Sequence, residues 1–351
     1  MTHIHLPRPW NLPESATTPE EVYVNRRDFL RRMGFAVGGA ALLGGCDVGD
    51  SKAGTPSAGG EGSGGAAQAA GPLDNVPPTP TAGLYPEAKK DDRFGPGPRI
   101  EAVTDEKVTA AYNNFYEFTT DKKSVWKTVG RFEARPWTVE VGGLVESPKT
   151  FDLADLERTM GLETRIYRHR CVEAWTVCVP WIGFPLRALL DRVSPRSEGR
   201  YVRFVSFDRP DQAPGQKSQD WYPWPYYEAL RMEEARNELA FLVTGMYGHP
   251  LQKQDGAPLR LHLPWKYGYK SIKSIVKIEV TREKPPVFWH DVVPDEYGWL
   301  ANVNPAVPHP RWSQARETIV ETGRKVPTEV FNGYGKWVSD LYTKEEMSTL
   351  S

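Results

Sequence analysis

Residues 165–186 read Arg165-Ile-Tyr-Arg-His-Arg-Cys171-Val-Glu-Ala-Trp-Thr-Val-Cys178-Val-Pro-Trp-Ile-Gly-Phe-Pro-Leu186. This stretch places Cys171 between a basic run typical of a β-strand and an aromatic, proline-containing turn. Arg168, His169 and Arg170 directly precede the cysteine, and neighbouring positive charge lowers the pKa of a thiol. The pattern therefore predicts a thiolate at Cys171, which would act as a nucleophile or as a ligand for a soft metal.

Three kinds of site are compatible with this cysteine: a hydrolase nucleophile, a zinc site, or a site for another metal. A Cys-His hydrolase requires an imidazole within hydrogen-bond distance, for which His169, His262 and His290 are candidates. Structural zinc is a poor match, because no histidine pair accompanies the two neighbouring cysteines. The second of these, Cys178, lies among apolar residues and is expected to be a buried core residue.

Two further clusters combine polar and aromatic residues. Asn113-Asn-Phe-Tyr-Glu-Phe118 suits recognition of a polar heterocycle, although composition alone favours an ordinary helix end or turn with aromatic anchors. Between Asp255 and Lys273 four basic residues alternate with glycines and aromatics. Arg260 and Lys273, with backbone amides near Ser271 and Ile272, would form a phosphate site; a solvated basic face is the alternative.

The overall composition is that of an ordinary globular protein. The chain has 351 residues, of which 39% are hydrophobic, and its 44 Lys and Arg against 45 Asp and Glu give a net charge of -1. Without a strong positive field, binding to nucleic acid or to an anionic membrane surface is not expected. Three cysteines also cannot build a disulfide framework.

The amino-terminal region, residues 1–45, resembles a twin-arginine export signal. Asn25-Arg-Arg-Asp-Phe-Leu-Arg-Arg-Met33 precedes a small apolar run that ends at Gly45. This signal implies export of a folded protein by the twin-arginine translocase, commonly with a cofactor already inserted, to the periplasm or cell envelope. Leu43-Gly-Gly-Cys46 resembles a lipobox and would make Cys46 a lipid anchor, whereas Ala67-Gln-Ala69 offers a competing cleavage site near residue 70.

The rest of the chain divides into a linker and one catalytic unit. Residues 46–83 are rich in Gly, Ala and Ser and are expected to be a flexible linker, whereas residues 84–351 contain no such break. Alternating or β-branched patterns predict strands at residues 137–141, 201–207, 239–243, 259–263 and 272–280. Helices are expected at residues 151–160, with Asp152 as the cap, 185–193 and 227–234. The expected class is α+β with mixed β-sheets and short helices.

Several sequence blocks, in the same order, resemble the catalytic subunit of the bacterial periplasmic protein-methionine-sulfoxide reductase from about residue 85 onward. The blocks, together with Arg26-Arg27, are residues 113–118, 170–175, 179–185, 254–258, 264–268, 294–298 and 301–305. This resemblance implies the sulfite-oxidase fold and one molybdenum-molybdopterin cofactor per chain, with Cys171 as both the catalytic residue and the metal ligand.

The resemblance also implies which residues contact the pterin and its phosphate: Asn113, Tyr116, Glu117, Ser206, Asp255, Arg260, Ser271, Ile272 and Lys273. Three of them depart from the form associated with the family, in which Thr, Asn and Gly take the places of Ser206, Asp255 and Ser271. An Asp in place of Asn loses hydrogen-bond donors, so the role of Asp255 is the least secure.

The implied reaction reduces methionine sulfoxide residues of oxidised periplasmic proteins to methionine, with two electrons and two protons forming water, and so repairs them. The sequence contains no Cys-x-x-Cys-His haem motif. Electrons are therefore expected from a partner, and the resemblance implies that this partner is a membrane haem-containing subunit supplied by the quinone pool, with this chain as a monomeric catalytic subunit. The alternatives are a sulfite-oxidising molybdenum dehydrogenase of the same fold, a Cys-His hydrolase, and a membrane-tethered binding protein.

Overall fold

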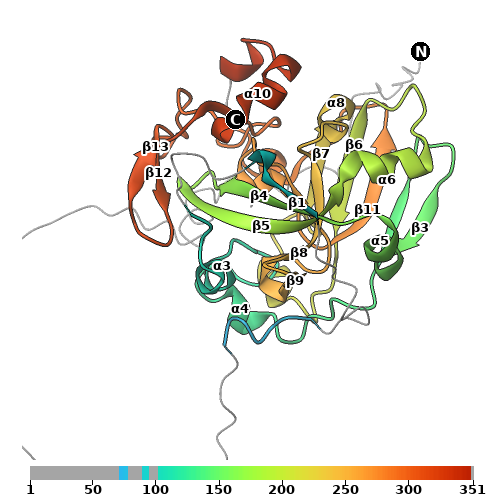
Figure 1. The fold of residues 1–351 in the computed structure, drawn as a ribbon, viewed down its shortest axis with the longest axis horizontal. Helices are drawn as coiled ribbons and strands as arrows, with labels where there is room; N and C mark the ends of the chain where they lie inside the picture. The colour runs from blue at the N-terminus through green and yellow to red at the C-terminus, as the bar shows by residue number, and fades with distance from the viewer. Residues whose placement is uncertain (1–70, 78–88, 95–101, 349–351) are drawn as a thin grey trace, which may run out of the picture. The chain divides into compact units, whose positions relative to one another are not determined.

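Two β-sheets organise the described part of this computed structural model, which comprises residues 71–77, 89–94 and 102–348 (Figure 1). The export signal, the candidate lipid anchor Cys46 and most of the expected linker lie outside the described residues. All of the described residues belong to one unit, residues 70–351.

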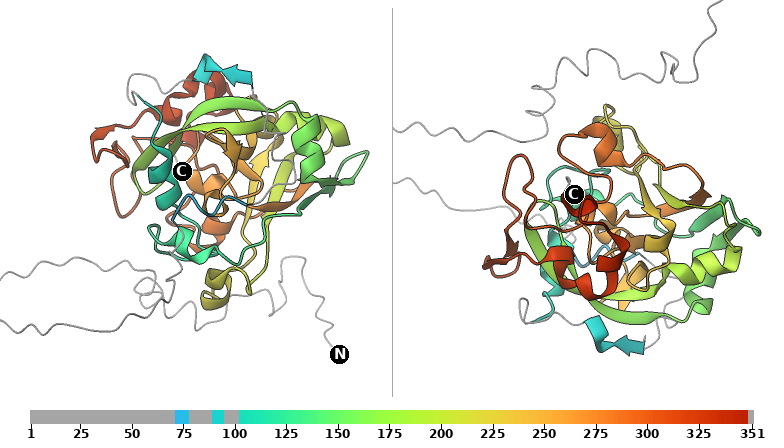
Figure 2. Two further views of the ribbon diagram at one scale, coloured as in Figure 1. Left: turned by 60° about the horizontal axis from the view of Figure 1, so that its bottom comes forward. Right: turned by 90° about the horizontal axis from the view of Figure 1, so that it is seen from above.

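The first sheet has the strand order β1-β4-β5-β12-β13, and β8 branches from β5 to pair with β9 and β10. Its strands are β1 (Lys89–Asp91), β4 (Glu163–Arg170), β5 (Trp175–Pro185), β8 (Phe241–Met246), β9 (His249–Pro250), β10 (Arg260–His262), β12 (Arg316–Ile319) and β13 (Lys325–Pro327). Figures 1 and 2 show β5 as a long curved strand. Cys171 lies in the turn between β4 and β5, which pair antiparallel.

The proline-containing stretch after Cys171 is a strand, so the predicted turn there is wrong. Pro180 lies opposite Ile166 of β4, and its carbonyl accepts a hydrogen bond from the amide of Tyr247. The β-branched and aromatic residues around Pro180 are almost all buried, and their packing between β4 and β8 outweighs the missing amide hydrogen of proline.

The second sheet has the strand order β3-β2-β11-β6-β7. Its strands are β2 (Thr138–Gly143), β3 (Lys149–Asp152), β6 (Tyr201–Ser206), β7 (Tyr227–Arg231) and β11 (Ile275–Thr281). The central strand β11 runs parallel to β2 and antiparallel to β6. Both sheets thus mix parallel and antiparallel pairs, and the expected α+β class is confirmed.

The helices are short. The α-helices are α3 (Glu106–Ala111), α4 (Val125–Thr128), α5 (Leu153–Thr159), α6 (Leu186–Val193), α7 (Pro214–Ser218), α8 (Met232–Ala235), α9 (Phe288–Val292) and α10 (Gly335–Val338). The 3-10 helices are η2 (Asp92–Phe94), η3 (Lys253–Asp255), η4 (Gly268–Lys270), η5 (Val330–Gly333), η6 (Ser339–Leu341) and η7 (Glu346–Ser348). Two predicted helices are confirmed as α5 and α6, and Asp152 caps α5 by accepting from the amides of Ala154 and Asp155.

The helix predicted at residues 227–234 is wrong over most of its length. Residues 227–231 form β7, which pairs antiparallel with β6, and helix α8 begins only at Met232. Glu228 of β7 is buried and forms an ion pair with Lys270 at 2.9 Å. Pairing with β6 and this tertiary contact outweigh the helical preference of Glu, Ala and Leu.

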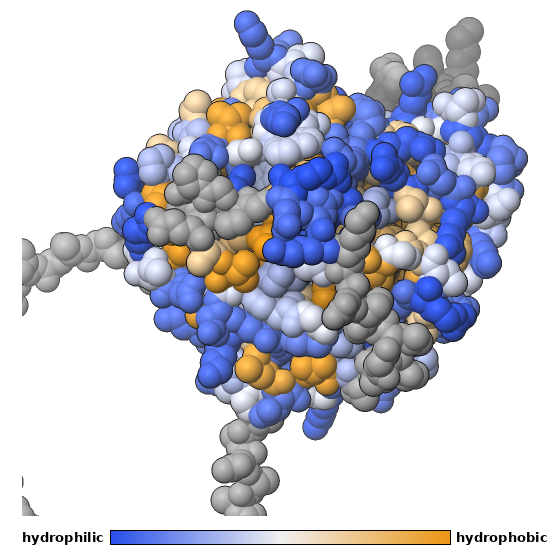
Figure 3. Space-filling view, viewed as in Figure 1, coloured by the Kyte–Doolittle hydropathy of each residue, from blue (hydrophilic) through white to orange (hydrophobic). Residues whose placement is uncertain are grey.

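The core includes Cys178, which is fully buried and packs with Ile319 and Val326, as its apolar neighbours predicted. On the face shown in Figure 3, apolar side chains form small separate patches among hydrophilic ones. Within the part of the chain that the structure describes, no helix has both the length and the apolar character that crossing a bilayer requires.

Candidate functional site

A cavity with about 1040 Å³ of empty space, part of it open to solvent, brings together segments that are far apart in the sequence. Nine of the ten predicted site residues line it: Cys171, Asn113, Tyr116, Glu117, Asp255, Arg260, Ser271, Ile272 and Lys273. The tenth, Ser206, is not among the lining residues. Its hydroxyl at the end of β6 donates to the carbonyl of Lys273 at 2.8 Å, so it supports the wall from behind.

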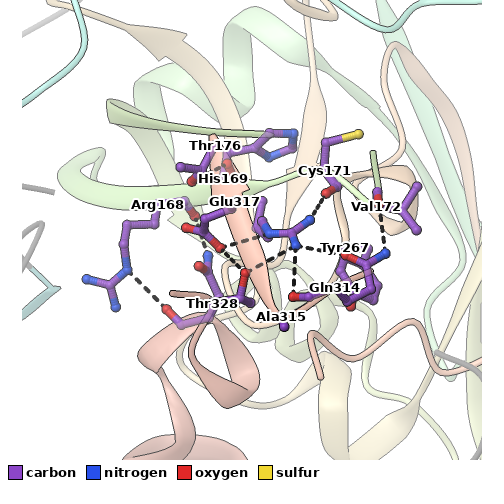
Figure 4. Close-up of polar contacts among 12 residues, drawn as sticks. Arg168, His169, Cys171, Val172, Thr176, Tyr267, Gln314, Ala315, Glu317 and Thr328 are labelled. Atoms are coloured by element: carbon purple, nitrogen blue, oxygen red, sulfur yellow. Dashed lines mark hydrogen bonds and ion pairs between the residues drawn. The ribbon is translucent and has the colours of Figure 1, made fainter. Parts of the chain in front are cut away.

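Cys171 occupies the turn that joins β4 to β5, and its side chain is 5% exposed. Its amide donates to the carbonyl of Trp175, and the amide of Ala174 donates back to the carbonyl of Cys171. Figure 4 shows the sulfur pointing away from the polar side chains of Gln314, Glu317 and Thr328. The tight turn therefore directs the sulfur toward the cavity.

The predicted stabilisation of a thiolate by the basic run is wrong for the protein without a bound cation. Burial and the Glu173 carboxylate raise the pKa of Cys171 to about 12, although the Glu173 amide, Lys122 and Arg170 oppose this shift. The guanidinium of Arg168 donates to the carbonyl of Asn332, and that of Arg170 pairs with Glu317, so neither approaches the sulfur closely enough to offset burial. A thiol in such a site ionises when it coordinates a metal.

Two polar residues beside the sulfur were missed by the sequence analysis. Asn114 Nδ2 and the amide of Glu173 each lie 3.4 Å from Cys171 Sγ. The Glu173 carboxylate accepts from Lys122 at 2.6 Å, Trp175 at 2.9 Å and Asn114 at 3.1 Å. Burial opposes its ionisation, but the Lys122 ammonium and these hydrogen bonds lower the pKa of Glu173. Both residues lie inside motifs that the sequence analysis singled out.

Elsewhere in the cavity lining, Asn113, Asp255 and Arg260 form a buried polar group. Asn113 Nδ2 donates to Asp255 Oδ1 at 2.7 Å, and Arg260 Nη1 donates to the carbonyl of Asp255 at 2.7 Å. Among the described residues, Asn113 Oδ1, Asp255 Oδ2 and Arg260 Nε and Nη2 are buried without a hydrogen-bond partner. Because such atoms are costly to leave unsatisfied, their convergence on one cavity fits a polar, anionic ligand such as a pterin with its phosphate.

Lys273 and Glu117 add a second pair of buried charged groups. Lys273 Nζ donates to the carbonyl of Asn114 at 2.8 Å and lies 5.2 Å from the centre of the Phe115 ring. Burial and the nearby Arg260 lower the pKa of Lys273, and burial raises the pKa of Glu117, each partner opposing the shift of the other. A bound anion beside Arg260 and Lys273 would favour their charged forms.

The predicted phosphate site is only partly assembled as expected. The amides of Ser271 and Ile272 donate within the chain, to the carbonyls of Gly268 and Lys270, each at 3.1 Å. Two of the four basic residues in this region are not available to bind a phosphate, because Lys266 and Lys270 form buried ion pairs with Glu234 and Glu228. An anion in the cavity would therefore be contacted by the side chains of Arg260 and Lys273 rather than by these amides.

The imidazoles expected for a Cys-His hydrolase do not bind the sulfur, whose hydrogen-bond partners are Asn114 and the Glu173 amide. His169 lines the cavity, but burial lowers its pKa well below the ordinary value, as it does for His262. His262 stacks on Trp181 with a ring separation of 4.7 Å. His290 Nδ1 contacts the carbonyl of Tyr297 at 2.8 Å.

Aromatic side chains form much of the remaining wall, and the sequence analysis identified only Tyr116 among them. They are Tyr112, Phe115, Tyr116, Trp175, Trp181, Tyr226, Tyr269, Trp289 and Tyr297. Tyr112 meets Trp175 edge-on at 5.2 Å, and Trp289 lies 5.3 Å from both Tyr116 and Tyr297. Such a wall suits a planar heterocycle or a thioether, since both have polarisable apolar surface.

Comparison with known proteins places these residues in a family context. Residues 126–289 match a family model described as the oxidoreductase molybdopterin binding domain. The protein-methionine-sulfoxide reductase catalytic subunit of Pseudomonas syringae pv. tomato is 42% identical over 344 residues, which cover 97% of each chain. The crystal structure of the sulfane dehydrogenase SoxCD from Paracoccus pantotrophus aligns with 43% of this chain and 40% of that chain, at 19% identity and a TM-score of 0.37.

Proposed function

Because this chain belongs to the family of molybdopterin-binding oxidoreductases that are catalytic subunits of protein-methionine-sulfoxide reductases, we propose that it reduces methionine sulfoxide residues of envelope proteins. Each turnover converts one sulfoxide, two electrons and two protons to one thioether and one water. The observation that carries this proposal is the single cavity that joins the Cys171 sulfur to the unsatisfied polar atoms of Asn113, Asp255 and Arg260.

The described residues fit one molybdenum-pterin group per chain. Cys171 would bind the metal, Asn113 and Asp255 would hydrogen-bond the pterin, and Arg260 with Lys273 would hold its phosphate. When bound, this group supplies two-electron oxygen-atom transfer, which the protein side chains cannot perform alone. The aromatic wall limits the access of water and leaves apolar surface for the methyl and methylene groups of the substrate.

The charge beside Cys171 favours a sulfoxide over sulfite as substrate. Glu173 keeps a negative charge next to the sulfur, and Lys122, its ion-pair partner at 2.6 Å, is held by that contact. Because Glu173 holds Lys122, this ammonium is not available to an anionic substrate such as sulfite, whereas a neutral sulfoxide needs no cation to bind it. Arg260, the arginine among the described residues that line the cavity, would be occupied by the pterin phosphate and so would not be available to sulfite.

Electrons for the reaction come, in our proposal, from a membrane haem protein supplied by the quinone pool. The sequence has no Cys-x-x-Cys-His motif for covalent haem attachment, and its three cysteines are too few for an iron-sulfur cluster beside the metal ligand Cys171; both observations support an external donor. Arg26-Arg27 and the apolar run after them support export through the twin-arginine translocase. An exported enzyme would meet oxidised proteins in the periplasm and repair them there. Cys46 is a candidate lipid anchor for it.

Two measurements test this proposal. Metal and pterin analysis of the purified protein is expected to find stoichiometric molybdenum, and a protein that is active without molybdenum would disprove the proposed site. An assay with a reduced dye should then show reduction of methionine sulfoxide, while an oxidised dye with sulfite should show little turnover. Faster turnover of sulfite would instead support the dehydrogenase alternative.

A further inference from the structure

A buried polar network lies directly behind the Cys171 turn (Figure 4). Arg170 is fully buried, and its Nε donates to Glu317 Oε2 at 2.8 Å. Its Nη2 donates to Gln314 Oε1 at 2.8 Å and to Thr328 Oγ1 at 3.2 Å. The remaining nitrogen, Nη1, donates to the backbone carbonyl of Cys171. The guanidinium thus connects three residues of the carboxyl-terminal segment to the backbone of the cysteine.

The carboxyl-terminal segment also donates hydrogen bonds to the carbonyls of two further residues of the turn, Val172 and Ala174. The carbonyl of Val172 accepts from Gln314 Nε2 at 2.7 Å and from Trp312 Nε1 at 2.8 Å. The carbonyl of Ala174 accepts from the amide of Thr318 at 2.9 Å, at the start of the β12–β5 pairing. The turn needs such support, because Ala174 has a φ of 63°, an unfavourable conformation for a residue with a Cβ.

Fixing this backbone fixes the sulfur. A cysteine side chain has a single heavy-atom torsion, so Sγ occupies one of three positions once the backbone is set. The network acts on the carbonyl side of the turn, and the sulfur points away from it (Figure 4). A buried ion pair such as Arg170–Glu317 contributes little net stability compared with apolar packing, but it is well suited to specifying a single geometry.

We propose that Arg170 and Gln314 are positioning residues, which hold the Cys171 turn so that its sulfur stays at the metal-binding position. Residues 312–328 are then part of the metal site, although they lie beyond residues 126–289, which match the molybdopterin-binding family model. This inference rests on the proposed role of Cys171 as the metal ligand.

The test replaces Gln314 with methionine, Gln314→Met, which keeps the length of the side chain but removes its hydrogen bonds to both Arg170 and Val172. We expect kcat to fall about 10- to 100-fold, the usual effect of losing a group that orients a metal ligand, with KM unchanged. The electron paramagnetic resonance spectrum of the bound molybdenum should change as well, because the sulfur moves relative to the metal.

Trp312→Phe is a milder second variant, since it removes one hydrogen bond to Val172 and keeps an aromatic ring; it should change the same spectrum to a smaller extent. Glu157→Gln is the control, because it weakens another buried ion pair, Arg135–Glu157, whose residues do not line the cavity. It should lower stability without changing the spectrum.

Unaltered spectra and kcat in both variants would overturn the inference, as would an equal spectral change in Glu157→Gln. If Gln314→Met does not fold, the outcome for Trp312→Phe decides. If purified wild-type protein contains no molybdenum, the proposed function is refuted. Failure of the proposed function can therefore be distinguished from failure of the positioning role.

Discussion

The Cys171 thiol is held in a cavity that disfavours its charge. Arg170 is paired with Glu317 behind the turn and Lys122 is paired with Glu173, so neither cation reverses the effect of burial. Burial raises the pKa of Cys171 to about 12, so a free thiolate nucleophile would be scarce at neutral pH. A metal cation changes this balance, because it binds the thiolate directly. The environment of Cys171 therefore favours a role as a metal ligand over a role as a nucleophile.

Replacing the cysteine tests that role. Cys171→Ser should abolish turnover and release the metal, because a hydroxyl is a harder and far less acidic ligand than a thiol. Cys178→Ala is the control: its side chain packs in the core with Ile319 and Val326, and its loss should cost about 1 kcal/mol and leave turnover intact. Turnover and molybdenum content of both variants are the measurements, and an active serine variant would contradict the assignment.

The buried carboxyl group of Asp255 should make the free energy of unfolding depend on pH. Burial raises its pKa from 3.8 to about 7, against the opposing effects of Arg260 and Asn113. Between these two values the folded form of the cofactor-free protein keeps a proton that the unfolded chain has released, so the free energy of unfolding falls as the pH rises.

Asp255→Asn removes this proton and should make the decline with pH shallower between about pH 4 and pH 7. Chemical denaturation of both proteins at several pH values measures the difference. Glu117 and Lys273 remain in the variant, so the comparison isolates Asp255 from the other titrating groups of the cavity. Identical slopes would show that Asp255 is ionised in the folded protein.

At the scale of elements, the available strand partners determined whether a segment with an ambiguous local pattern became a strand or a helix. Residues 227–231 contain good helix formers, yet they form β7 because β6 supplies a strand partner and Lys270 an ion-pair partner for Glu228. The helices α5 and α6 were predictable, since their caps and apolar spacing lie within one short segment. The strand β5 was not, because its neighbours β4, β8 and β12 come from distant parts of the chain.

The close approach of β5 to β8 can be tested by a substitution at Gly183. A Cβ on Gly183 would lie 1.9 Å from the carbonyl oxygen of Leu242, at the register shift between the two strands. Gly183→Ala should therefore force the backbones apart and lower the free energy of unfolding by about 1–3 kcal/mol.

Gly130→Ala is the matched control, since a Cβ there meets no atom within 4 Å. Thermal unfolding of the two variants measures the contrast. If both variants unfold at the same temperature, the close approach of β5 to β8 is not as the structure describes it.

At the scale of the whole molecule, segments far apart in the sequence line the cavity, and a segment outside the catalytic unit predicted from composition supports one of its loops. Residues 71–77 pack on the loop that carries Asp255: Pro72 accepts from Gln254 at 2.5 Å, and Asn75 accepts from the amide of Lys253 at 3.2 Å. Asn75 also donates to the carbonyl of Trp126 at 2.9 Å. These contacts attach residues 71–77 to the loop of Asp255, which lines the cavity.

Two truncations test the importance of this segment. Compared with a chain that begins at residue 71, one that begins at residue 78 loses three hydrogen bonds, each with a net value of about 1 kcal/mol. We expect the shorter chain to be less stable by roughly 1–3 kcal/mol and to retain less molybdenum. Equal melting temperatures and equal metal contents would show that residues 71–77 do not support the site.

The amino-acid sequence was sufficient for properties that depend on short-range patterns and on ordered motifs: the α+β class, the helices α5 and α6, the burial of Cys178 and nine of the residues that line the cavity. Folding decided what depends on contacts between distant residues. The direction of the Cys171 pKa shift, the pairing of Lys266 and Lys270 with buried carboxylates, and the support of the cysteine turn by Arg170 and Gln314 all belong to this class. Charge and desolvation act through space, so the neighbours that set them cannot be found from positions along the chain alone.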